Sequence, residues 1–289
     1  MKKKILFIVN PISGGQNKTF IPSLIDAHLN HNLFKTEIIF SEFVGHANTL
    51  AKEAVLKDFE IIIAVGGDGT INEVASAVES SGKIMGIIPC GSGNGLARTL
   101  KIPLNNINAI KRINHLNTTK IDVGLLNDKK FFNMAGIGFD AHISAHFAKD
   151  KKRGFTGYIK STLKEITNYL PQKYIIDIDG VRIEKEAFMI SIANSSQYGN
   201  NAHISASASV KDGLLDLCVI KAFPLYAFPI LGYRMFANST HYSKYVEIIQ
   251  GKEIKIHKKK GPVHVDGEPV MMGEEVEIKI KHLALELVI

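Results

Sequence analysis

Cysteine is scarce in this sequence, and long apolar runs are missing from it. Cys90 and Cys218 are the two cysteines among 289 residues, and they lie far apart, each in an apolar context. We therefore expect two reduced core residues, no disulfide framework and an intracellular protein. The most apolar region, 214–233, is interrupted by Asp216, Lys221 and two prolines, so no stretch is long enough to span a bilayer. These absences predict a soluble protein.

The N-terminal residues imitate a signal peptide but do not complete one. Three lysines precede the short apolar run Ile5–Val9, which ends at Asn10 and Pro11. An h-region needs about 7–15 apolar residues. We therefore expect no cleaved leader and a cytoplasmic location.

Motifs of several common nucleotide and metal sites are also missing. No Gly-Lys-Ser/Thr follows any glycine-rich stretch, which excludes a Walker A loop. No Gly-x-Gly-x-x-Gly occurs at these stretches, which disfavours a dinucleotide dehydrogenase. The 11 histidines show no paired spacing typical of zinc ligands, so the sequence singles out none of them.

Positive charge exceeds negative charge. The formal net charge is +7, and basic residues cluster at 149–153 and 258–260. Solvated loops are the plain interpretation of either cluster. Together they also suit a surface that touches anionic lipid headgroups or nucleic acid. No basic–aromatic motif supports nucleic acid as a partner, so we expect the chain not to bind it.

Strand-like and helix-like segments alternate up to about residue 120. The predicted strands are 4–9, 36–40, 60–65 and 84–88, and the predicted helices are 18–29, 46–56, 71–78 and a short one from Leu96. In the third helix, Ile71, Val74 and Val78 fall on one face at helical spacing. Repeated strand–helix–strand units predict a parallel sheet covered by helices.

Beyond residue 120 the pattern changes to alternating strands and tight turns. Asp179-Gly180 is a hairpin signal, and helical interruptions are expected at 140–149, 156–169 and 225–237. The apolar parity of the last strand shifts after His282, which indicates a bulge or a change of sheet.

The two patterns predict two domains. We expect a Rossmann-like α/β domain with a parallel sheet over 1–122, and an antiparallel β-sandwich domain over 123–289. Return of the last strand to the N-terminal domain is left open.

Three glycine-rich loops follow predicted strands, at 10–15, 66–72 and 89–95. Glycine lets the backbone approach a phosphate closely, and the helix that follows points its free N–H groups at the anion. All three loops are expected at the carboxyl edge of the sheet, where open α/β folds bind ligands. Asp68, placed among glycines, indicates an oriented magnesium ion or nucleotide.

In this order the motifs resemble the diacylglycerol kinase catalytic domain family, which includes bacterial soluble lipid kinases and the sphingosine and ceramide kinases. The matching segments, which cover nearly the whole chain, are 10–15, 66–73, 89–94, 136–140, 212–216 and 265–269. The Gly-Gly-Asp-Gly-Thr element alone is not specific, because NAD kinases and phosphofructokinases share it. The resemblance implies a fold like that of the NAD and diacylglycerol kinases. It also implies an ATP- and Mg²⁺-dependent kinase that phosphorylates the hydroxyl of a diacylglycerol-like or related lipid alcohol.

The resemblance also implies roles for individual residues. The residues that it assigns to ATP binding are Asn10, Ser41, Gly66, Gly67, Asp68, Gly69, Thr70, Asn72, Ser92, Gly93 and Asn94. Asp68 would lie near the nucleotide and its magnesium and take part in catalysis. Asp266 and Glu268 would form the acidic turn that supplies the general base, and their spacing does not decide between them.

A structural magnesium site is a further implication of the resemblance. Its ligands would be the Asp212 side chain and the carbonyl oxygens of Ser209 and Leu214. Gly95 departs from the aspartate or alanine that is common at this place in relatives.

Plainer interpretations stand beside these roles. The 265–268 segment is also a good two-residue hairpin, and Asp212-Gly213 is a plausible simple turn. Asp140 suits the N-terminus of a helix as a charge partner, or else a lipid headgroup. Arg98 is interpreted as an ordinary helix residue that faces solvent.

Two other functions stay open: an NAD kinase, and a nucleotide- or lipid-binding regulator that has lost catalysis. The expected partner is the lipid substrate at the inner membrane surface, reached by transient peripheral contact through the basic clusters. The identity of the lipid and the existence of a homodimer are left open.

Overall fold

A computed structural model describes residues 2–15, 17–149, 162 and 165–289 of the chain. Its internal contacts divide the chain into two compact units. The first unit comprises Met1–Ile121 with Leu283–Ile289, and the second comprises Asp122–His282. The sequence places the boundary between residues 122 and 123.

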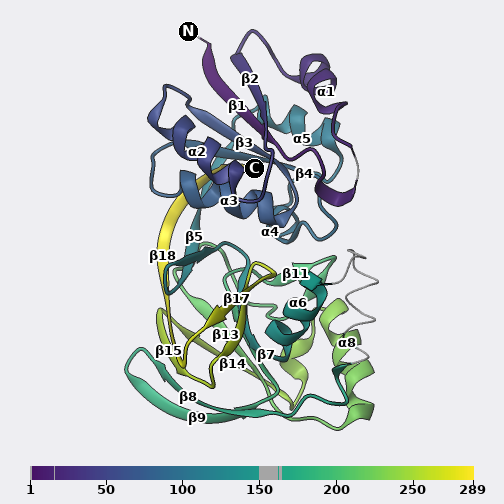
Figure 1. Ribbon diagram of the computed structural model, residues 1–289, viewed down its shortest axis with the longest axis vertical. Coiled ribbons are helices and arrows are strands. Elements are labelled where there is room, and N and C mark those ends of the chain that lie inside the picture. The colour runs from purple at the N-terminus through teal and green to yellow at the C-terminus, as the bar shows by residue number, and fades with distance from the viewer. Residues whose placement is uncertain (1, 16, 150–161, 163–164) are drawn as a thin grey trace. The chain divides into compact units, whose positions relative to one another are not determined.

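The first unit is a parallel sheet covered by helices, as the sequence predicts (Figure 1). Its strand order is β2-β1-β3-β4, followed by the end of β18. The strands are β1 (Lys3–Val9), β2 (Phe34–Phe40), β3 (Ile61–Gly66), β4 (Ile84–Pro89) and β18 (Glu275–Val288). All six residues of β3 are buried, because a central parallel strand is covered on both faces. This confirms the Rossmann-like α/β architecture.

Helices pack on this sheet in two pairs, α1 with α5 and α2 with α3. The helical segments are η1 (Ser13–Gly15), α1 (Ile21–His28), α2 (His46–Leu56), α3 (Asp68–Val78), α4 (Gly95–Thr99) and α5 (Asn106–Ile113). Helix α5 was not expected from the sequence. Its N-cap is Asn105, whose side chain accepts the Asn108 N–H at 3.1 Å. Helix α5 therefore begins with an ordinary capping signal that the sequence already contained.

The second unit is an antiparallel β-sandwich, which confirms the second predicted architecture. One sheet has the order β14-β13-β10-β7-β16-β17, and the other contains β9, β8, β15 and the beginning of β18. The strands are β5 (Thr118–Leu126), β6 (Lys129–Phe131), β7 (Met134–Gly138), β8 (Gln172–Ile178), β9 (Val181–Ala187), β10 (Met189–Ala193), β11 (Gln197–Gly199), β12 (Ala202–His203), β13 (Leu215–Ile220), β14 (Val246–Gly251), β15 (Glu253–His257), β16 (Gly261–Val265) and β17 (Glu268–Met272). Side chains of both sheets, such as Ile176 and Ile190, share one core.

The last strand, β18, belongs to both units. Its first part pairs antiparallel with β15, and Glu286 and Leu287 near its end pair parallel with β4. Leu283 has a φ of 49°, a left-handed conformation that breaks the alternation of side chains between the two parts. The shift of apolar parity after His282 therefore marks a change of partner strand, from β15 to β4, and not the change of sheet that the sequence offered as one interpretation.

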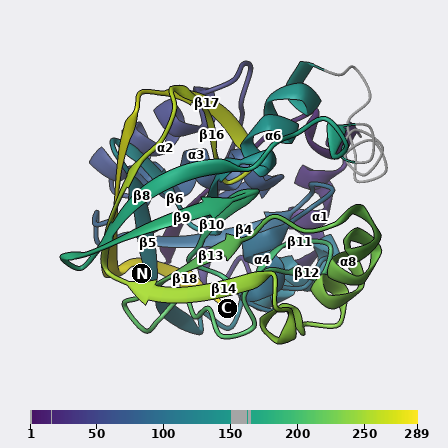
Figure 2. The ribbon, with the colours of Figure 1, turned by 90° about the horizontal axis from the view of Figure 1, so that it is seen from below.

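Helices of the second unit lie near the places that the sequence indicated. They are α6 (Phe139–Lys149), η2 (Leu225–Ala227), α8 (Phe228–Phe236) and η3 (Thr240–Tyr242). Helix α6 packs on β16 and β17 (Figure 2). Most of the helix expected at 156–169 falls outside the described residues. Among the helices that the structure describes, none has both the length and the apolar character needed to cross a membrane.

Candidate functional site

The three glycine-rich loops are joined to one another at the carboxyl edge of the first unit's sheet. The Asn10 N–H donates to the Val65 carbonyl at 2.9 Å, and the Cys90 N–H donates to the Gly66 carbonyl at 2.7 Å. The Asn10 side-chain amide also donates to the Thr70 hydroxyl at 3.0 Å. Because β1, β3 and β4 are neighbours in the sheet, their loops meet at one place.

Two of the glycines are required by close backbone packing. A Cβ atom on Gly66 would lie 2.5 Å from the Cβ of Thr70, and one on Gly91 would lie 2.6 Å from the Cα of Gly67. Since neither neighbour can move without displacing a loop, a larger residue would push the loops apart. The glycines thus let the loop segments pack directly against one another and against Thr70.

Asp68, in the 66–72 loop, connects this loop to the 89–95 loop. Its Oδ2 accepts the Asn94 N–H and its Oδ1 accepts the Gly95 N–H, both at 2.8 Å. These are charge-assisted hydrogen bonds to backbone at the start of α4. The carboxylate therefore has a bracing role in the loop, and its expected place near magnesium stays a prediction.

The 89–95 loop is closed by its own side chains. Asn94 is left-handed, with a φ of 53°, and its side chain bonds both the N–H and the carbonyl of Gly91, at 2.9 and 2.8 Å. The Arg98 Nε donates to the Gly93 carbonyl at 3.0 Å. The interpretation of Arg98 as an ordinary solvent-facing residue is therefore wrong, because this side chain holds the loop.

A pocket of about 480 Å³ lies beside this loop, within the first unit. Residues that line it include Lys18, Cys90, Gly91, Ser92, Asn94 and Arg98. Lys18 is only 2% exposed, so two cations and several backbone groups border the pocket. Such a lining suits phosphate. The sequence predicted Ser92 and Asn94 but missed Lys18, which no motif distinguishes from other lysines.

The remaining predicted nucleotide residues of the first unit lie outside the lining of this pocket. Ser41 follows β2, is buried, and donates its N–H to the Val9 carbonyl at 2.9 Å. Asn72 lies on α3, where its side-chain oxygen accepts the Ser76 hydroxyl at 3.3 Å. Asn10 and Thr70 bond each other, as described above. The edge of the sheet brings these residues near one another in the fold, and their contact with a nucleotide stays a prediction.

Cys90 is a free thiol at the pocket wall, and Cys218 is a free thiol in the core of the second unit. Burial raises the pKa of Cys90, although the charge of Lys18 opposes this effect. The thiol is therefore neutral near pH 7 and acts as part of the wall.

The acidic turn of the second unit is a two-residue hairpin turn. Asp266 and Gly267 have φ values of 47° and 86°, and Val265 pairs with Glu268 across β16 and β17. This geometry is that of a type I′ turn. The hairpin interpretation is thus correct, and it does not conflict with a catalytic role for either acid.

The two acids of this turn differ in their surroundings. The Asp266 carboxylate accepts the backbone N–H groups of Phe132, Asn133 and Met134 at 2.9, 2.9 and 3.0 Å. Glu268 is exposed at the start of β17. The oxygens of Asp266 are therefore engaged in holding the 132–134 backbone, whereas Glu268 faces solvent.

A buried ion pair lies under this turn. The His264 Nε2 is 2.6 Å from the Asp140 Oδ2, and the residues are 2% and 5% exposed. Burial by itself lowers the pKa of His264, but the charge and hydrogen bond of Asp140, helped by Asp266, hold that pKa above its ordinary value. Asp140 therefore ties the start of α6 to β16, and its buried carboxylate does not favour contact with a lipid headgroup. The sequence gave no signal for His264.

The residues expected to hold a structural magnesium form a turn. Asp212 Oδ1 accepts the Leu214 N–H at 3.0 Å, and the Ser209 hydroxyl oxygen accepts the Lys211 N–H at 3.3 Å. A carboxylate and backbone carbonyls are the hard oxygen ligands that magnesium prefers. The residue types present therefore fit the ion.

Carboxylates gather around this turn. Burial raises the pKa of Asp212, and the like charges of Asp216 and Asp122 add to this rise. Asp122, missed by the sequence analysis, is fully buried and accepts the Gly213 N–H at 2.7 Å. A bound cation would relieve the repulsion among the three acids.

Comparison with known families matches both units. A model of the diacylglycerol kinase catalytic domain matches residues 4–126. A model of the YegS C-terminal NAD kinase beta sandwich-like domain matches residues 133–288.

Curated relatives and a solved structure agree with these matches. The diacylglycerol kinase of Bacillus subtilis (strain 168) is 27% identical over 291 residues, which cover 96% of this chain and 94% of that protein. The diacylglycerol kinase of Staphylococcus carnosus (strain TM300) is 27% identical over 279 residues, covering 93% and 89%. The crystal structure of a diacylglycerol kinase from Bacillus anthracis str. Sterne, 23% identical, shares the fold with a TM-score of 0.76 over 99% of this chain and 96% of that one. The chain therefore joins a domain of the diacylglycerol kinase catalytic family to a C-terminal domain of the YegS family, and it is a lipid kinase.

Proposed function

We propose that this lipid kinase transfers the γ-phosphoryl group of ATP, in the presence of Mg²⁺, to the hydroxyl of diacylglycerol or a closely related lipid alcohol. The observation that carries the proposal is the glycine-rich edge of the first unit, with its pocket bordered by Lys18 and Arg98. The names of the relatives supply the lipid class. Phosphoryl transfer needs positioned phosphates, charge stabilisation and an acceptor for the hydroxyl proton, and the residues of this pocket can provide the first two.

The phosphates of ATP are assigned to the pocket beside the 89–95 loop. Lys18 and Arg98 would balance their negative charge. Asp68 holds the loop in the required shape through its two backbone hydrogen bonds. Bound magnesium would neutralise charge that develops on the phosphates. The Asp212 turn is the proposed holder of the separate, structural ion.

Glu268 is the proposed general base. It is exposed, whereas the Asp266 carboxylate already accepts three backbone hydrogen bonds. A base must be free to take the proton of the substrate hydroxyl. Asp266 is therefore assigned a structural role, which is to fix the turn that presents Glu268.

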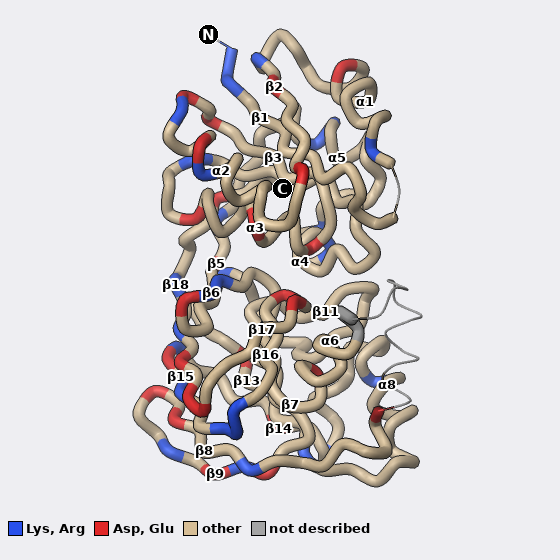
Figure 3. Tube along the Cα trace, viewed as in Figure 1, with Lys and Arg blue, Asp and Glu red and all other residues tan. Residues whose placement is uncertain are grey.

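The membrane contact is assigned to an exposed apolar face of the second unit, defined by Tyr226, Ile230 and Tyr233. These side chains recur at spacings of four and three residues along η2 and α8, and each is more than half exposed. Between residues 223 and 245 the sequence has two basic residues and no acidic one. Charged residues of this unit instead follow β8, β9 and β15 (Figure 3). An apolar face on a segment that itself contains no acidic residue suits an anionic lipid surface that carries the substrate.

The basic clusters predicted for membrane contact are less suited to this role. Lys258 is buried, and its ammonium donates to the carbonyls of Lys259 and Gly261 at 3.1 and 3.2 Å. Only Lys259 and Lys260 of this cluster are exposed. The 149–153 cluster falls almost entirely outside the described residues.

The function is tested with labelled ATP, Mg²⁺ and a panel of lipid alcohols in mixed micelles, with NAD in a parallel reaction. We expect label in a diacylglycerol-type lipid and none in NAD. Label in NAD and in no lipid would favour the NAD kinase alternative. The membrane face is tested by sedimentation with anionic vesicles, in which Tyr226→Ser and Tyr233→Ser together should reduce binding while Tyr242→Ser, a matched exposed tyrosine, leaves it unchanged.

A further inference from the structure

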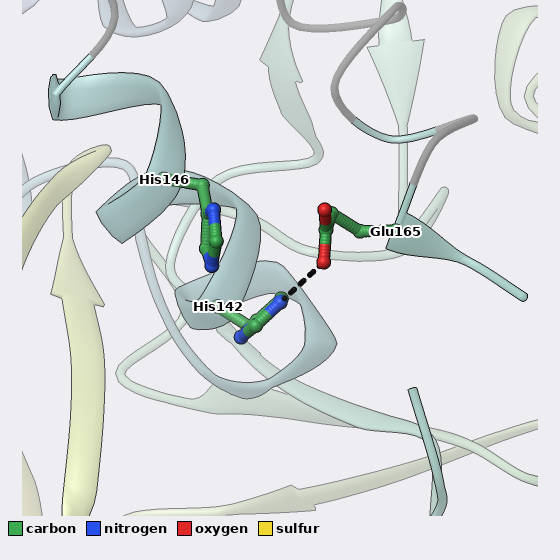
Figure 4. Close-up of side chains that lie close together, drawn as sticks. All are labelled: His142, His146 and Glu165. Carbon is green, nitrogen blue, oxygen red and sulfur yellow. Dashed lines mark hydrogen bonds and ion pairs between the residues drawn. The ribbon is translucent and has the colours of Figure 1, made fainter. Parts of the chain in front are cut away.

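Two histidines and a glutamate of the second unit, none of which belongs to the acidic turn or the Asp212 turn, lie close together (Figure 4). His142 and His146 stand one helical turn apart on α6, with ring centroids 4.4 Å apart. Glu165, from a separate helical segment, places its Oε2 3.2 Å from the His142 Nε2. One ligand atom from each of the three side chains lies within 4.8 Å of the others.

We propose that His142, His146 and Glu165 bind a divalent transition-metal ion of the Zn²⁺ class. Imidazole nitrogen and carboxylate oxygen are ligands that zinc prefers, and two histidines at i and i+4 of a helix present their rings on one face. Zinc bonds of about 2.0–2.1 Å in a tetrahedron separate neighbouring ligand atoms by roughly 3.4 Å. The His142–Glu165 pair is already at this distance, and small side-chain rotations bring in His146.

The surroundings support the site from one side and leave it open on the other. The His142 ring lies against Tyr169 and Phe139, at centroid distances of 5.4 and 6.4 Å. These rings limit its rotation and lower the local polarity, which strengthens a charged interaction. His146 is exposed, so an ion and a water molecule as fourth ligand can enter.

A simple ion pair does not account for the whole cluster. Contact between His142 and Glu165 explains two members, but the His146 ring also lies over His142. The expectation of no paired histidine spacing is wrong, because His142 and His146 differ by four residues on a helix. Only the fold brings Glu165, which is distant in sequence, to this pair.

The ion would fasten two parts of the second unit. Helix α6 is held at its start by the Asp140–His264 pair and packs on the hairpin that carries Glu268. A metal at His142 and His146 would attach the segment around Glu165 to the same helix. This inference does not depend on the proposed function, since metal binding is measured without lipid or nucleotide.

The experiment is calorimetric titration of the tag-free, metal-depleted full chain with Zn²⁺ in excess Mg²⁺, which occupies sites made of hard oxygen ligands. The variants are His146→Gln and Glu165→Gln, and the matched control is His115→Gln, an exposed histidine of the first unit. Circular dichroism checks that each variant is folded. Substituting Co²⁺ for Zn²⁺ adds a visible spectrum that reports tetrahedral coordination.

We expect one Zn²⁺ per wild-type chain and a tetrahedral Co²⁺ spectrum. Each ligand variant should weaken binding at least about tenfold, because changes even in the partners of metal ligands cost about 10–100-fold. The control should bind as the wild type does. Absence of Zn²⁺ binding by the wild type, or an equal affinity of His146→Gln and His115→Gln, would overturn the proposal.

Discussion

Replacing Asp266 by asparagine tests the structural role of this acid separately from the catalytic role that is proposed for Glu268. The Asp266 carboxylate accepts three backbone N–H groups from residues 132–134. Asparagine has one acceptor oxygen, so its amide group must face at least one of these donors. An unsatisfied donor costs about 1–3 kcal/mol, and each of the other two bonds loses about 1 kcal/mol with its charge. We expect Asp266→Asn to reduce the free energy of unfolding by about 3–5 kcal/mol.

The matched variant is Glu268→Gln. Glu268 is exposed, and a surface substitution of this kind changes stability by less than about 0.5 kcal/mol. Its transfer rate should nevertheless fall by about 10²–10⁴-fold, the range that general base catalysis contributes. ATP affinity should stay the same.

The assays are equilibrium unfolding in urea and phosphoryl transfer at saturating ATP. Two results would refute the reasoning. One is an Asp266→Asn variant as stable as the wild type, and the other is a Glu268→Gln variant with a near-normal rate.

Three further predictions concern the loops and the buried ion pair. Asp68→Ala removes the acceptor of two backbone hydrogen bonds, so phosphoryl transfer should be abolished while circular dichroism shows a folded chain. Near-normal turnover would contradict the placement of the nucleotide. Arg98→Gln should weaken ATP binding about tenfold by calorimetry, equivalent to about 1.4 kcal/mol, whereas the exposed Lys101→Gln should not; equal effects would exclude the pocket as the phosphate site. The pKa of His264 is raised in the folded protein by its pairing with Asp140. This pairing therefore stabilises the folded state fully below about pH 6.5, and the stabilisation is lost as the pH rises through the raised pKa. His264→Gln should flatten this part of the stability profile in urea, and an unchanged profile would show that the pair does not contribute.

Local sequence patterns were sufficient to predict most of the fold. The run Ile61–Val65 followed by Gly66 and Gly67 contains a buried strand, a close-packed loop and a helix start, all within about 15 residues. The parity shift after His282 likewise indicated a break within β18, where its partner strand changes from β15 to β4, because side-chain alternation is set by neighbouring residues.

Contacts between distant residues set the limit of prediction at the candidate site. The sequence could not rank Asp266 against Glu268, since the difference depends on backbone donors at 132–134, more than 130 positions away. Lys18 and Asp122 were missed for the same reason, because each acquires its environment only through folding.

The most direct test of the central claim is transfer of the γ-phosphoryl group from ATP to diacylglycerol in mixed micelles, measured side by side for the wild type and Glu268→Gln. The account predicts magnesium-dependent formation of phosphorylated lipid by the wild type, and its near-complete loss in the variant with unchanged ATP affinity. Phosphorylation of NAD alone, or equal lipid phosphorylation by both proteins, would contradict it.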